Sequence, residues 1–159
     1  MPPAPRVVKE GVVVEDPRVL RLLFVCALAV WLGSVVSFSY VVLPAIHREA
    51  APGDAIPLLR RLFPRYYATG TLCGFIALAI VSLARAGSAL PVGEALRMGL
   101  PVAGGLVCSL AAQQLLLPRM RAARDQQPGR YERLHAVSAM LNSTVIALLF
   151  LALAGAVLR

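Results

Sequence analysis

Four long stretches of this sequence contain no charged residue, and they constrain the fold more than any other feature. They cover residues 22–46, 66–84, 98–117 and 134–158. A helix rises about 1.5 Å per residue, so each stretch is long enough to cross a hydrocarbon core about 30 Å thick. Every Asp, Glu, Lys and Arg lies outside these stretches, as the cost of burying charge in lipid requires. The sequence therefore predicts an all-α integral membrane protein whose four spans pack as a bundle.

The composition excludes the other common classes. Hydrophobic residues make up 58% of the chain and charged residues 15%, a balance that soluble domains of this size do not show. A transmembrane β-barrel needs alternating polar and apolar residues, and the run 145–154 does not alternate. The first span follows a polar segment that carries three acidic residues, so we expect it to be retained rather than cleaved as a signal peptide.

The segments outside the spans suggest a simple organisation. Residues 1–17 are rich in proline and lack a helical period, so we expect a flexible tail before one transmembrane domain over 18–159. Between the first two spans, Asp54 is predicted to cap a short amphipathic helix that lies along the membrane surface. Its apolar face consists of Ile56, Leu59, Leu62 and Phe63. Pro64 is expected to break this helix before the second span, and 118–133 is expected to be a polar connection.

The charges favour an orientation rather than a nucleic-acid function. The net charge is +8, but the basic residues flank the ends of the spans, and no nucleic-acid-binding motif is present. An even number of spans places both termini on one side, with seven basic residues on that side and nine on the other. The positive-inside rule then predicts that both termini lie outside the cytoplasm. The Ala-, Arg- and Leu-rich composition favours a bacterial inner membrane.

Pairs of small residues, four positions apart, occur in three of the spans. In lipid such pairs let helix backbones approach closely, because no hydrophobic driving force brings helices together there. We interpret them as packing positions within the bundle, with an oligomer interface as the alternative. The pairs are Gly33 and Ser37, Gly70 and Gly74, and Gly105 and Ser109.

Polar residues inside the spans are the candidates for a functional site, because each needs a partner where water is absent. Spacing places His135, Ser138 and Asn142 on one face of the fourth helix, and Gly105, Ser109 and Gln113 on one face of the third. Tyr66 and Tyr67 begin the second span, where aromatic rings favour the headgroup boundary. The predicted ligand-binding residues are Tyr66, Tyr67, Gln113, His135, Ser138 and Asn142.

Two interpretations of this polar set remain open. Gln113, Ser138 and Asn142 could hydrogen-bond to one another and hold the helices in register. Alternatively, they could line a pocket with His135 at its mouth and an arginine rim that attracts anionic groups. The rim would consist of Arg61, Arg119, Arg121 and Arg133.

His47 and His135 are the only histidines, and both fall at span ends on the same side. Together they could ligate haem or copper, although the sequence has no HExxH or CxxCH motif. Cys26, Cys73 and Cys108 each sit alone in a different span, so we read them as packing residues. No carboxylate pair, nucleophile elbow or phosphate-binding glycine loop is present. We therefore expect no metal, no cofactor and no enzymatic activity.

Several short motifs, in their order along the chain, resemble the transmembrane protein 205-like family. These are Trp31-Leu32-Gly33, Val42-Leu43-Pro44, Leu62-Phe63-Pro64-Arg65-Tyr66-Tyr67 and Arg133-Leu134-His135-Ala136-Val137-Ser138 with Asn142. The resemblance spans residues 20–158 and implies a four-helix membrane protein of unknown function, whose eukaryotic relatives have been linked to tolerance of toxic compounds. His47 stands where the family pattern leads us to expect an aromatic or aliphatic residue, which weakens the two-histidine interpretation.

The leading hypothesis is thus a non-enzymatic membrane protein whose loop-rich face binds or helps export a small solute or toxic compound. A redox protein that uses His47 and His135 is one alternative. A scaffold subunit, which packs as a homo-oligomer or against a partner through its small-residue pairs, is another.

Overall fold

The structure is a computed structural model that describes residues 16–49, 51, 54–123 and 128–158. Its helices follow one another with short connections, and two of the joins are π-helical turns rather than loops. The elements are α1 (Pro17–Ser37), η2 (Phe38–Val42), α2 (Leu43–Glu49), α3 (Ala55–Ala86), α4 (Val92–Ala111), η3 (Ala112–Leu116), α5 (Leu117–Ala123) and α6 (Pro128–Val157).

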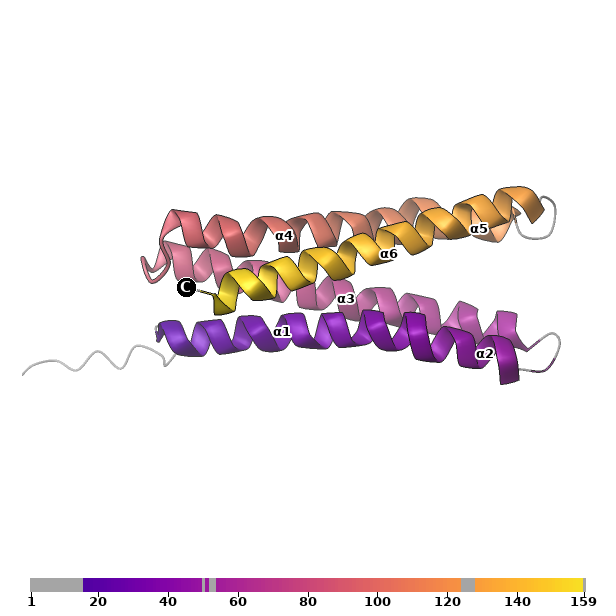
Figure 1. Ribbon diagram of the computed structural model, residues 1–159, viewed down its shortest axis with the longest axis horizontal. Helices are drawn as coiled ribbons and strands as arrows, with labels where there is room; N and C mark the ends of the chain where they lie inside the picture. The colour runs from indigo at the N-terminus through magenta and orange to yellow at the C-terminus, as the bar shows by residue number, and fades with distance from the viewer. Residues whose placement is uncertain (1–15, 50, 52–53, 124–127, 159) are drawn as a thin grey trace, which may run out of the picture.

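Four long rods form the bundle, and two of them combine several elements (Figure 1). The first rod is α1-η2-α2, the second is α3, the third is α4-η3-α5 and the fourth is α6. Each contains a helix long and apolar enough to cross a membrane: Pro17–Ile46, Pro57–Ala86, Val92–Met120 and Glu132–Val157. The predicted all-α, four-span architecture is confirmed.

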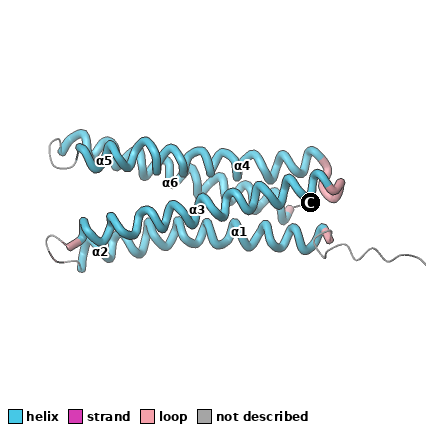
Figure 2. The backbone as a smooth tube through the Cα atoms, turned by 180° about the vertical axis from the view of Figure 1, so that it is seen from behind, coloured by secondary structure: helices cyan, strands magenta, loops and turns pink. Residues whose placement is uncertain are grey.

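The two ends of the bundle differ in what they carry. The chain starts α1 and finishes α6 at one end, which we call the terminal end (Figure 1). At the opposite end, which we call the loop end, α2 and α5 finish and α3 and α6 begin, and helix fills the length between the ends (Figure 2). Of the predicted tail 1–17, α1 takes Pro17, and residues 1–15 lie outside the described part of the chain.

Packing around the bundle follows the order α1, α3, α4, α6, with a lighter contact between α6 and α1 that closes the ring. In this arrangement α3 lies diagonally opposite α6, and α1 lies diagonally opposite α4. Each helix turns one face inward, and these faces meet in a core centred on Phe24, Leu28, Trp31, Val102 and Leu149. The opposite faces carry apolar side chains outward, as contact with lipid requires.

Trp31 occupies the centre of this core and is only 1% exposed. A Cβ atom added at Gly70 would come within 2.7 Å of its Nε1, and one at Gly74 within 2.9 Å of its Cζ3. On α4, a Cβ at Gly105 would lie 3.5 Å from the same ring. Two helices thus present glycine where the indole of a third approaches their backbones.

Pro44 and Pro118 lie inside the first and third rods without ending them. Each follows a leucine whose N–H donates to the carbonyl five residues earlier, from Leu43 to Phe38 and from Leu117 to Ala112. A proline ring collides with the carbonyl four residues before it, and a π-helical turn widens the helix at that point. The first and third rods therefore extend past the predicted span ends at 46 and 117, to Glu49 and Ala123.

The predicted surface helix before the second span is corrected in one respect. The segment is helical, but it is continuous with the span as a single 32-residue helix, and Pro64 lies inside it. Leu59 packs with Phe38 and Ile46 in a second apolar cluster, and this contact holds the turns before Pro64 in line despite the lost backbone hydrogen bond. Asp54 sits at the N-cap position, but its side chain makes no capping hydrogen bond.

The predicted polar connection 118–133 is also corrected. Its described residues are helical and belong to α5 and α6.

Replacing Gly70 with alanine tests the central packing. The new methyl group would overlap the rigid indole of Trp31, and we expect the free energy of unfolding to fall by about 1–3 kcal/mol. Gly93→Ala is the matched control, because a Cβ there also meets no atom within 4 Å. Since alanine favours helix over glycine, Gly93→Ala should be neutral or stabilising by up to ~1 kcal/mol. Thermal unfolding in detergent, followed by circular dichroism, compares the two; equal stabilities would contradict the role of Gly70.

Candidate functional site

A hydrogen-bonded chain of three side chains links three rods in the loop-end half of the bundle. The Tyr66 hydroxyl on α3 donates to Oδ1 of Asn142 on α6, at 3.0 Å. Nδ2 of Asn142 donates in turn to Oγ of Ser39, in the π-helical turn η2, at 2.7 Å. All three residues are half-buried. The amide of Asn142 thereby holds the first, second and fourth spans to one another.

Aromatic rings surround the Tyr66 end of this chain. Phe38, next to Ser39, stacks on Tyr66 with ring centroids 4.5 Å apart. Phe63 meets Phe38 edge-on at 5.2 Å and stacks with Tyr67 at 6.2 Å. Tyr66 and Tyr67 contact each other edge-on at 4.9 Å. Four rings from α3 and η2 thus form one continuous group, which orients the Tyr66 hydroxyl toward Asn142.

A second polar contact joins the same two helices. Tyr67 is buried, and its side chain interacts with that of Ser138, one turn before Asn142 on α6. Because α3 and α6 are diagonal neighbours, both tyrosines cross the interior of the bundle to reach their partners. In the same half, the ribbon pair α2 and α3 diverges from the pair α5 and α6 toward the loop end (Figure 1). Tyrosine is long enough to bridge helices that separate in this way.

We call Ser39, Tyr66, Tyr67, Ser138 and Asn142, with the rings of Phe38 and Phe63, the loop-end cluster. Four of the six predicted ligand-binding residues belong to it. Gln113 is half-buried in η3, the corresponding π-helical turn of the third rod, and the structure shows no hydrogen bond from it to this cluster. Instead of the predicted bonds to Gln113 and Ser138, Asn142 hydrogen-bonds to Tyr66 of α3 and Ser39 of η2.

The two hydrogen bonds of Asn142 go to Tyr66 and Ser39 rather than to a histidine or an arginine. His135 is exposed on α6, about 10 Å of helical rise from Asn142, and the side chain of His47 lies outside the described part of the chain. Arg61, Arg119 and Arg133 are exposed toward the loop end, on α3, α5 and α6, and the side chain of Arg121 is not among those described. Within the described residues, no three His, Cys, Asp or Glu side chains are grouped so that they could hold a metal ion.

The small-residue pairs have different surroundings. Gly70, Gly74 and Gly105 face Trp31, and Ser109 is buried one turn further along α4. Gly33 and Ser37 are exposed on the outer side of α1. The same spacing therefore serves two faces, one inside the bundle and one outside it.

Sequence reasoning missed Ser39 and Phe38. Neither belongs to a recognisable motif, and Ser39 reads as one of several serines in an apolar span. The available signal was Leu43-Pro44, since a proline in mid-span indicates a local change of helix geometry just before it. Phe38 and Ser39 fall in that altered turn, next to α3 and α6.

The loop-end cluster is electrically neutral and suited to binding. Tyr, Ser and Asn side chains donate and accept hydrogen bonds without carrying charge at neutral pH. Among the described residues, the two bonds of Asn142 use one of its two N–H groups and one of the two lone pairs on its oxygen. The amide keeps capacity for one further donor and one further acceptor beside four aromatic rings.

Comparison with known proteins assigns the chain to a family. The family described as "Domain of unknown function (DUF4149)" matches residues 26–128, and the chain belongs to it. No curated protein and no solved structure matches the chain. The match extends from the middle of α1 to the start of α6. It does not carry the transmembrane protein 205-like resemblance, which stays a prediction.

A double-mutant cycle tests whether Asn142 couples the helices. Tyr66→Phe removes the hydroxyl that donates to the amide, and Ser39→Ala removes the acceptor on its other side. Each change should lower the free energy of unfolding by about 0.6–2 kcal/mol. The loss of unfolding free energy in the double variant should differ from the sum of the two single losses by about 0.5 kcal/mol or more, because both changes act through one amide.

Unfolding of the detergent-solubilised protein by sodium dodecyl sulfate supplies these values. Tyr40→Phe is the matched control, because Tyr40 lies in the same π-helical turn as Ser39 and is 66% exposed; it should leave stability unchanged. Strict additivity of Tyr66→Phe and Ser39→Ala would show that Asn142 does not couple the spans.

Proposed function

We propose that this membrane protein of the DUF4149 family binds a small uncharged aromatic solute at the loop-end cluster. The role is one of binding rather than catalysis, and it serves tolerance or export of that solute. The observation that carries the proposal is the neutral chain Tyr66–Asn142–Ser39 beside four packed aromatic rings. Aromatic walls with a few directed polar groups are the usual composition of small-molecule sites.

The cluster connects the two pairs of rods, because it joins α3 of the first pair to α6 of the second. The ribbons of these two pairs diverge toward the loop end (Figure 1). Each pair contains one π-helical turn directly before a Leu-Pro sequence, η2 in the first and η3 in the third rod. Such turns are frequent at functional sites and let a rod bend locally. A solute between the pairs would meet Asn142 from α6 and Tyr66 and Tyr67 from α3.

The link to tolerance rests on the resemblance to the transmembrane protein 205-like family, through Trp31, Gly33, Pro44, Phe63, Pro64, Tyr66, Tyr67, His135 and Asn142. Three of these positions belong to the cluster: Tyr66 and Asn142 hydrogen-bond to each other, and Tyr67 interacts with Ser138. A charged solute would lose its hydration beside these neutral groups without gaining a counter-charge. The geometry therefore favours an uncharged ligand, with the exposed arginines as a separate feature of the loop end.

Binding of 2-naphthol and naphthalene to the purified protein tests the proposal. Both probes are flat and apolar, but only 2-naphthol can donate a hydrogen bond. At a hundredfold excess over its Kd, 2-naphthol should stabilise the protein against unfolding by about 2.7 kcal/mol. Asn142→Leu and Tyr67→Phe should each weaken 2-naphthol binding by roughly 2- to 13-fold, the loss of one neutral hydrogen bond. Naphthalene binding should not change in Tyr67→Phe.

Tyr40→Phe again serves as the matched control, because it removes an exposed hydroxyl from the same region. Cells that produce the wild-type protein should also tolerate more 2-naphthol than cells with equal amounts of the Asn142→Leu protein in their membranes. Absence of 2-naphthol binding, or equal binding by wild type, Asn142→Leu and Tyr67→Phe, would refute a solute site at the cluster.

The exposed pair Gly33 and Ser37 favours a second candidate function, assembly with a second copy of the chain. A Cβ at Gly33 would meet no atom of its own bundle within 4 Å, so the backbone of α1 is open to close approach by another helix. Gly33→Leu should then shift the protein from dimer to monomer in analytical ultracentrifugation. Gly93→Leu is the matched control, since Gly93 is also exposed with open space around it. A monomeric wild type, or equal effects of both changes, would exclude this interface.

A further inference from the structure

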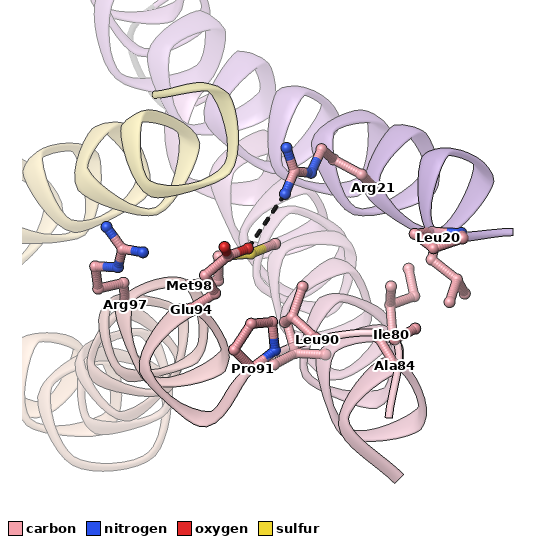
Figure 3. A pocket seen from close by; sticks show the side chains of 12 residues that line it. Leu20, Arg21, Ile80, Ala84, Leu90, Pro91, Glu94, Arg97 and Met98 are labelled. Atoms are coloured by element: carbon pink, nitrogen blue, oxygen red, sulfur yellow. Dashed lines mark hydrogen bonds and ion pairs between the residues drawn. The ribbon is translucent and has the colours of Figure 1, made fainter. Parts of the chain in front are cut away.

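A cavity of about 250 Å³ lies at the terminal end of the bundle, between α1, α3 and α4 (Figure 3). This volume corresponds to roughly eight water molecules at about 30 Å³ each. Much of its wall is apolar: Leu20 from α1, Ile80, Val81 and Ala84 from α3, Met98 from α4, and Leu90 from the connection between α3 and α4. The cavity is at the opposite end of the molecule from the loop-end cluster, and its interpretation is independent of the function proposed above.

Three charged side chains line the same cavity. Arg21 on α1 and Glu94 on α4 form an ion pair with Nη2 and Oε2 3.4 Å apart, and both side chains are about a quarter exposed. Arg97 lies one turn further along α4, so that Glu94 stands between the two arginines (Figure 3). The lining carries two positive charges and one negative charge, and Arg21 is already held by the carboxylate. Arg97 is therefore the cation that a ligand would meet.

The position of these charged residues along the helices indicates which part of the membrane surrounds the cavity. Arg21 lies in the first turns of α1, Glu94 and Arg97 in the first turns of α4, and Ala84 in the last turn of α3. Helices that cross a membrane place these turns at the boundary between headgroups and hydrocarbon. A cavity at this level has phosphate groups on one side and acyl chains on the other.

We propose that this cavity is a binding site for a phospholipid, in which Arg97 binds the phosphate and the apolar wall takes the first part of an acyl chain. A planar guanidinium matches phosphate oxygens with two parallel hydrogen bonds. Arg21 adds positive charge from the other side of Glu94, and the ion pair holds it against the lining of the cavity. The volume suits the region where headgroup and chain join, rather than a whole lipid.

Other ligands fit the lining less well. A free inorganic anion would make no favourable contact with the apolar part of the wall. A divalent cation would find a single carboxylate, already paired, between two arginines, whereas such ions need several oxygen ligands. An alkyl chain without a phosphate would leave Arg97 unused. Only a molecule with both a phosphate and an acyl chain contacts both Arg97 and the apolar wall.

Native mass spectrometry of the detergent-purified chain measures the binding directly. The three probes are phosphatidylglycerol, diacylglycerol with the same acyl chains, and inorganic phosphate. We expect one tightly bound phosphatidylglycerol, binding of diacylglycerol at least about tenfold weaker, and no displacement of the lipid by inorganic phosphate. Displacement by inorganic phosphate would make the cavity an anion site and overturn the proposal, and equal binding of the two lipids would show that the headgroup is not recognised.

Two pairs of matched variants locate the site. Arg97→Gln should weaken phosphatidylglycerol binding by about 10- to 100-fold, the loss of a charge-assisted hydrogen bond. Arg85→Gln removes the same charge from the same end, outside the cavity, and should have no effect. Ala84→Leu should fill part of the cavity and weaken binding, whereas Ala86→Leu on the exposed side of the same helix end should not.

Circular dichroism and thermal unfolding confirm that each variant is folded before binding is compared. If Ala84→Leu does not fold, the comparison of Arg97→Gln with Arg85→Gln tests the proposal by itself. Equal losses in Arg97→Gln and Arg85→Gln would reduce the effect to general attraction between a basic surface and lipid, and would overturn the proposal.

Discussion

The contact between Trp31 and the glycines of α3 and α4 is the constraint on which the rest of the bundle depends. Lipid offers no hydrophobic gain for helix association, so shape and close contact must hold the spans together. The indole can approach α3 only where Gly70 and Gly74 lack side chains, and this sets the rotation of α3 about its axis. Tyr66 lies one turn before Gly70, on the same inward face. The packing of one tryptophan thus directs the tyrosine of the loop-end cluster toward α6.

Both prolines within the rods, Pro44 and Pro118, follow a π-helical turn, but the two turns place different side chains. Both η2 and η3 widen the helix before a Leu-Pro sequence, which keeps each rod continuous. In η2 the altered turn brings Ser39 to Asn142 and Phe38 to Tyr66. In η3 the corresponding turn presents Gln113 without a bond to this network. Only the turn in the first rod thus contributes to the loop-end cluster.

Sequence patterns predicted the four spans correctly, but they misjudged the face of one small-residue pair and the effect of one proline. The four spans follow from the distribution of charges, and the inward role of Gly70, Gly74 and Gly105 agrees with the small-residue interpretation. Gly33 and Ser37 have the same spacing but face outward, because the pattern does not say which face of a helix is buried. Pro64 was expected to end a helix, yet packing of Leu59 against Phe38 and Ile46 outweighs that local preference. Ser39 escaped notice because its importance arises from a partner 103 residues away.

The number of membrane crossings could be read from the amino-acid order alone. The cost of placing a charge in hydrocarbon belongs to each residue type and needs no knowledge of its neighbours in space. The partners of the polar groups could not be read in this way. They depend on how each helix is rotated and where the rods diverge, and both are set by contacts between spans that are distant along the chain. Hence Asn142 was recognisable as a buried polar group, but only the folded bundle assigned it to Tyr66 and Ser39.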